Sequence, residues 1–124
     1  MTKKKGPFRK EVIEFALDRD VQEEIERALL AIKKHPNNSS FYVSLGDLYY
    51  SQKKMEPAVS TYVQALQVDP GNTRAHTRLG QICAMYELYS EAWQHARAAA
   101  LLGDPHLKEQ LERNGIPEPP SQSA

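Results

Sequence analysis

The sequence has little of what small secreted or metal-binding domains depend on. Its 124 residues include one cysteine, Cys83, which excludes a disulfide framework and a CxxC metal pair. No long apolar run follows the basic stretch "MTKKKGPFRK", because acidic residues already interrupt the next ten residues. The sequence therefore predicts neither a signal peptide nor a membrane-spanning segment. We expect a cytoplasmic protein that is stabilised by apolar packing alone.

An excess of charge of either sign is also lacking. Sixteen lysines and arginines balance 16 aspartates and glutamates, so the formal net charge is zero. A dedicated nucleic-acid-binding protein normally carries a positive excess, and no nucleic-acid partner is expected. Residues 1–4 are interpreted as a basic, disordered N-terminus, and the alternative for the lysines at 3–5 is contact with RNA, acidic lipid or a partner.

Sequence motifs for catalysis and metal binding are absent as well. The serines lie in no Gly-x-Ser-x-Gly elbow, and the six glycines form neither a GxGxxG nor a Walker pattern. His76 and Cys83 are seven residues apart on one expected helix. That spacing separates them by about 10.5 Å along the axis, too far for one ion. We therefore predict no enzyme activity, no metal site and no cofactor.

The residues that are present favour helices. Apolar residues recur at helical spacing, and the turn signals "KHPNN" at 34–38 and "VDPGN" at 68–72 separate the segments. No segment alternates in the manner of a strand, so we expect an all-α protein. Asp20 and Glu23 have the spacing of a capping box, which predicts a helix start at that point. The Pro- and Ser-rich tail, 115–124, is predicted to be disordered.

A period of 34 residues runs through the chain. Glycine in a helix costs about 1 kcal/mol relative to alanine, yet a Leu-Gly pair occurs twice in expected helices. Sliding the sequence by 34 residues aligns five pairs of identical residues: Leu45 with Leu79, Gly46 with Gly80, Ala58 with Ala92, Ala65 with Ala99, and Pro36 with Pro70.

These positions resemble the tetratricopeptide repeat. Its aromatic-x₂-Leu-Gly-x₂-Tyr…Ala-x₃-aromatic…Pro pattern is matched by Tyr42, Leu45, Gly46, Tyr49, Ala58, Tyr62 and Pro70. Residues 39–72 resemble one full repeat, 73–106 a looser copy, and 5–38 a degenerate helix pair. The resemblance implies a right-handed all-α solenoid of antiparallel helix pairs.

Two packing expectations follow from this resemblance. Gly46 is expected to face Ala58, and Gly80 to face Ala92, so that paired backbones approach closely. The segment 105–114, with Leu107 and Leu111, is expected to form a helix that caps the last repeat. Trp93 is expected to pack beneath this helix, and the alternative is an exposed anchor for a partner.

In this family, the first helix of each repeat lines a concave groove that binds an extended peptide or a helix of another protein. The resemblance places ten residues in such a groove: Arg9, Val43, Ser44, Asp47, Tyr50, Arg74, Thr77, Arg78, Gln81 and Met85.

The arginines of this groove suggest an acidic partner. Arg74 and Arg78 are one turn apart, and neither has an acid three or four residues away on its own helix. With Arg9 they resemble the cations of a carboxylate clamp, although Ile13 and Ser44 stand where the clamp has asparagines. The alternative is internal pairing of Arg78 with Asp47 on the adjacent helix.

The sequence thus predicts a non-catalytic interaction module or adaptor that binds a peptide or helix of another protein, with an acidic segment as one candidate. One alternative is a structural assembly subunit that self-associates through the ends or faces of the solenoid, as a homo-oligomer. A further alternative is a small chaperone of the same repeat type.

Overall fold

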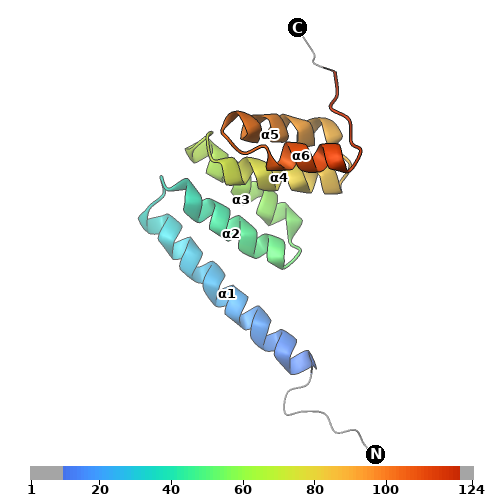
Figure 1. Cartoon of the computed structure of the whole chain (residues 1–124). Coiled ribbons are helices and arrows are strands. Elements are labelled where there is room, and N and C mark those ends of the chain that lie inside the picture. Colours follow the sequence, from blue (N-terminus) through green and yellow to red (C-terminus); the bar gives the residue numbers. More distant parts are fainter. Residues whose placement is uncertain (1–9, 121–124) are drawn as a thin grey trace, which may run out of the picture.

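The helices of the protein stack in chain order. The computed structural model describes residues 10–120, with side chains from residue 19 onward. The described part contains six helices and no strand: α1 (Lys10–Lys34), α2 (Ser39–Ser51), α3 (Met55–Val68), α4 (Thr73–Met85), α5 (Tyr89–Leu101) and α6 (His106–Arg113). Successive helices lie side by side, as Figure 1 shows. The all-α solenoid of antiparallel helix pairs with a C-terminal capping helix is confirmed.

Two helix pairs, α2–α3 and α4–α5, share the same N-cap and the same turn. Asn38 and Asn72 cap α2 and α4, each with a side-chain oxygen that accepts a hydrogen bond from a backbone N–H of the first turn. Within each pair, the turn contains one residue with a positive φ of 61°, Lys53 in the first pair and Glu87 in the second. The 34-residue period therefore applies to the backbone as well as to the sequence.

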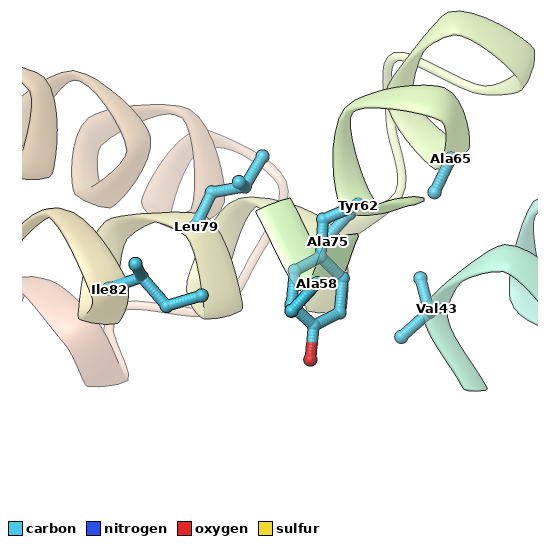
Figure 2. Close-up of a cluster of buried hydrophobic side chains, with 7 residues drawn as sticks. All are labelled: Val43, Ala58, Tyr62, Ala65, Ala75, Leu79 and Ile82. Carbon is cyan, nitrogen blue, oxygen red and sulfur yellow. The ribbon is translucent and has the colours of Figure 1, made fainter. Parts of the chain in front are cut away.

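Apolar side chains from α2, α3 and α4 form the main core. Figure 2 shows this cluster, in which the Tyr62 ring lies between the helices with small residues around it. Its buried members are Val43, Ala58, Tyr62, Ala65, Ala75, Leu79 and Ile82. Because the cluster draws on both pairs, it joins the repeats into one body.

The helical glycines are sites of close packing, and the expected neighbour Ala92 is among the residues nearest to Gly80. A Cβ at Gly46 would lie 2.5 Å from Cε1 of Tyr62, so the atoms nearest to this position belong to the Tyr62 ring. At Gly80, a Cβ would overlap Leu107 and would lie 3.1 Å from Cβ of His95 and 3.4 Å from the Ala92 carbonyl oxygen. A helix pair with larger residues at these positions could not close in this way.

The first segment differs from its prediction. Residues 5–38 were expected to form a helix pair, but Lys10–Lys34 is one continuous helix of 25 residues. No glycine or proline interrupts this segment, so nothing ends the helix, and the predicted capping box at Asp20 and Glu23 lies inside it. Its second half packs on α2, and in Figure 1 its N-terminal end extends beyond the α2–α3 pair.

The C-terminal end is closed by α6 and by the residues that follow it. Leu107 and Leu111 are buried against Trp93, whose Nε1 donates a hydrogen bond of 3.2 Å to the Ile116 carbonyl. Glu118 pairs with Arg97 at 2.7 Å. The prediction of disorder over 115–124 is therefore wrong for the residues up to Glu118, because Ile116 supplies apolar contact and Glu118 a charge. Residues 1–4 and 121–124 lie outside the described part.

Two histidines link α4 to α5. Nε2 of His76 lies 2.9 Å from the Pro70 carbonyl, which can only accept, so this nitrogen carries the hydrogen. In the neutral ring, Nδ1 of His76 is then the acceptor for Nδ1 of His95, 3.2 Å away. Burial lowers the pKa of His95, and the neighbouring charge of His76 lowers it further.

No helix of the described residues has the length and apolar character that crossing a membrane requires.

The Gly46 packing predicts that Gly46→Ala destabilises the protein. The Tyr62 ring is fully buried and cannot move away, so we expect a loss of about 1–3 kcal/mol in the free energy of unfolding measured with urea. Gly71→Ala is the matched control, because a Cβ there meets atoms only at 3.4 Å and beyond; its effect should stay within about 0.5 kcal/mol. Equal stability of the two variants would contradict the packing described.

The histidine pair predicts a pH dependence of stability. Because the folded state depresses the pKa of His95, the unfolded state takes up the proton first, and the stabilisation is present above about pH 6.5 and lost as the pH falls below it. His95→Asn keeps a donor towards His76 without titrating. We expect its melting temperature to fall less than that of the intact protein between about pH 7.5 and pH 5. Parallel pH profiles for both proteins would show that His95 is not responsible.

Candidate binding groove

One face of the solenoid gathers most of the predicted groove residues. Eight of the ten side chains come from α2 and α4 and lie at least partly at the surface: Ser44, Asp47, Tyr50, Arg74, Thr77, Arg78, Gln81 and Met85. Arg9 lies outside the described residues.

Asp47 is the centre of the polar contacts on this face. Its Oδ2 pairs with Nη2 of Arg74 at 2.9 Å, and its Oδ1 pairs with Nε of Arg78 at 3.0 Å. The Tyr62 hydroxyl donates a hydrogen bond of 2.5 Å to the same Oδ1. The Asp47 carboxylate on α2 thus pairs with two arginines of α4 and also accepts a hydrogen bond from Tyr62 in the core.

Tyr62 remains a hydrogen-bond donor to this carboxylate. Burial raises the pKa of its hydroxyl well above the ordinary value, and the hydrogen bond to Asp47 raises it further. The hydroxyl is therefore protonated throughout the physiological range, and it orients the Asp47 carboxylate towards the groove.

Internal pairing, the alternative considered for Arg78, is what the structure shows for both arginines. Two cations share a single anion, so the network keeps one positive charge in excess. The side chain of Arg74 is 60% exposed, and only one of its nitrogens is engaged. Arg78 also donates to Gln81 Oε1 at 3.3 Å.

A pocket of about 430 Å³ continues this face towards the C-terminus. Tyr50 and Met85 stand at its edge, where the tyrosine hydroxyl donates to the Met85 sulfur at 3.4 Å. The capping helix α6 forms the opposite wall with Gln110 and Asn114, above an apolar floor that includes Leu107. The pocket therefore offers apolar surface together with side-chain amides that can both donate and accept.

The role of α6 in this pocket was not anticipated from the sequence. Gln110 and Asn114 follow Leu107 and Leu111 at spacings of three residues, so a helical projection places these amides beside the apolar stripe. This arrangement of amides could have indicated that the helix lines a pocket. From the sequence, only a capping role is predicted for it.

Among the predicted groove residues, Val43 is not at the surface, and Thr77 is partly exposed but does not present its hydroxyl. Val43 is fully buried in the main core, because its position on α2 faces α3. The hydroxyl oxygen of Thr77 is buried without a hydrogen-bond partner. Both were assigned from the family register, which does not resolve how far α2 and α4 are rotated towards each other.

Among the side chains that the structure describes, no group of three His, Cys, Asp or Glu residues is arranged to hold a metal ion.

Comparison with known proteins finds the repeat in the central part of the chain. The family model described as "TPR repeat" matches residues 46–85, which include the C-terminal part of α2, all of α3 and all of α4. Tetratricopeptide repeats in general mediate interactions between proteins. No curated protein matches the chain.

A solved structure supports the fold over a longer range. The crystal structure of MamA superimposes with a TM-score of 0.62 at 23% sequence identity and covers 80% of this chain. The match covers 54% of the MamA chain, so the present chain spans about half of that protein. At this level of identity the likeness concerns the fold alone.

The Asp47 network predicts that Asp47→Ala costs stability. Removal of the carboxylate leaves the buried Tyr62 hydroxyl without its acceptor, which we expect to lower the free energy of unfolding by about 1–3 kcal/mol. Glu118→Ala breaks an exposed ion pair with Arg97 and is the control, with an expected effect below about 1 kcal/mol. If Asp47→Ala were no more destabilising than the control in urea unfolding, Asp47 would not connect the groove to the core.

Proposed function

We propose that the protein is a non-catalytic interaction module that binds a peptide or helix of another protein along the face formed by α2, α4 and α6. The observation that carries this proposal is the pocket between Tyr50, Met85 and α6, which opens beside the Asp47 network. An apolar side chain of the partner would enter this pocket. Backbone groups of the partner would bond the amides of Gln81, Gln110 and Asn114.

The surface around Met85 supports the proposal. Met85 is 56% exposed at the mouth of the pocket, although it belongs to a helix with three buried apolar side chains. A methionine side chain adapts its shape to a partner because it is unbranched and polarizable. Its sulfur also accepts the Tyr50 hydroxyl, so a ligand in the pocket would contact both residues.

An acidic residue in the partner fits the charge of the groove. Asp47 neutralises one of the two arginines, and Arg74 retains N–H groups that point to no acceptor among the described residues. A partner carboxylate at Arg74 would form a charge-assisted hydrogen bond without displacing Asp47. Salt would weaken this contribution more than the apolar contact in the pocket.

The proposal predicts that a charge in the pocket abolishes partner binding. Met85→Glu places a carboxylate at the mouth of the pocket, and we expect partners captured from lysate by the intact protein to be lost. Leu101→Glu is the matched control, because Leu101 is 89% exposed at the end of α5 and does not line the pocket. Captured proteins are identified and quantified by mass spectrometry.

Both variants must first show the melting temperature of the intact protein. Loss of the same partners in Leu101→Glu, or their retention in Met85→Glu, would contradict binding in this groove.

A further inference from the structure

A second, more apolar pocket lies on the side of α4 away from the groove. It has a volume of about 420 Å³. Leu79 and Cys83 face it from positions about half a helical turn away from Gln81. Ile82 also lines it from α4. The other lining residues come from the start of α3 and from the turn after α4: Met55, Glu56, Val59, Ser60, Tyr86 and Leu88.

The turn that borders this pocket has an internal counterpart in the preceding repeat. In the α4–α5 turn, the Glu87 N–H donates to the Ala84 carbonyl and the Leu88 N–H to the Cys83 carbonyl. The α2–α3 turn makes the same two bonds, from Lys53 and Lys54. With φ at 61° in both, the two turns share one backbone conformation.

The side chains of the two turns are nonetheless opposite in character. Tyr86 and Leu88 are 57% and 49% exposed, whereas the α2–α3 turn carries Gln52 and Lys54 at the equivalent positions. The fold of the turn therefore does not require apolar residues there. Exposed apolar side chains around an apolar pocket indicate an interaction surface.

The one charged residue among those that line the pocket is acidic. Glu56 lines it, Glu87 lies between Tyr86 and Leu88 in the turn, and Glu91 is close enough to act on Cys83. The complementary charge occurs elsewhere in this sequence. The stretch "KKKGPFRK" at 3–10 contains five cations and no acid around Phe8, in a chain whose net charge is zero.

We propose that this pocket docks the basic segment 3–10 of a second copy of the chain, with Phe8 in the pocket and the flanking cations opposite the glutamates. This surface is separate from the groove of the proposed function. Apolar burial of the phenylalanine ring supplies affinity, and the charges select the orientation.

The segment comes from another molecule because its own chain cannot deliver it. Phe8 is two residues from the start of α1 at Lys10, a reach of about 7 Å. α1 packs against α2, whereas the pocket is built from α3, α4 and the turn after α4. The axes of neighbouring packed helices are about 8–10 Å apart. Because the pocket does not lie on α2, the helix next to α1, its distance from Lys10 exceeds this reach. Docking joins copies head to tail, which produces rings or open chains.

The first experiment measures the mass of the full chain by analytical ultracentrifugation over a concentration series. We expect the mass to rise with concentration for the intact protein and to stay monomeric for Tyr86→Gln/Leu88→Lys. This double variant installs the residues of the α2–α3 turn and leaves Glu87, so it should fold with an unchanged melting temperature. Met85→Glu, in the groove, is the control and should still associate. A monomeric intact protein, or association that survives the double substitution, would overturn the proposal.

The second experiment identifies the occupant directly. A labelled synthetic peptide of residues 1–10 is titrated with the intact chain and with the double variant, and binding is followed by fluorescence anisotropy. Replacing Phe8 by alanine in the peptide should weaken binding about tenfold or more, the loss expected for one buried aromatic ring. A peptide that does not bind, or whose Phe8→Ala form binds equally well, would show that segment 3–10 is not the occupant.

Discussion

The close contact between Gly46 and the Tyr62 ring is the constraint on which the rest of the structure depends. The ring occupies the space of a side chain at position 46, which sets the distance between α2 and α3. Its hydroxyl emerges beside Asp47 and bonds the carboxylate that holds Arg74 and Arg78. Packing inside the repeat thereby determines where the charges of the groove lie, and the core and the site are connected through one residue.

The same constraint is met differently in the next repeat, and the difference creates the pocket. The position equivalent to Tyr62 is Ala96, which leaves space over Gly80. Leu107 of α6 fills that space from outside the repeat. The capping helix is thus drawn against α4, where Gln110 faces the side that carries Met85. A departure from the repeat pattern explains both the closure of the solenoid and the far wall of the groove.

The 34-residue period predicted the α2–α3 and α4–α5 pairs because the Leu-Gly pairs, small residues and turn signals agree with one another. It failed for α1, where no glycine or proline breaks the helix. Most groove positions followed from the family register. The pairing of Arg74 with Asp47 and the burial of Val43 did not, since they depend on the rotation of neighbouring helices and on side-chain reach. The wall formed by α6 depends on how Leu107 docks, which spacing alone does not determine.

The central claim is that the face between α2, α4 and α6 receives a partner protein. Its most direct test is photo-cross-linking from a benzophenone amino acid placed at Gln81, in the groove, and separately at Gln64, an exposed position on the outer side of α3. The structure predicts that a bound partner is captured from position 81 and not from position 64. Capture from position 64 alone, with none from position 81, would contradict the assignment of the groove as the binding site.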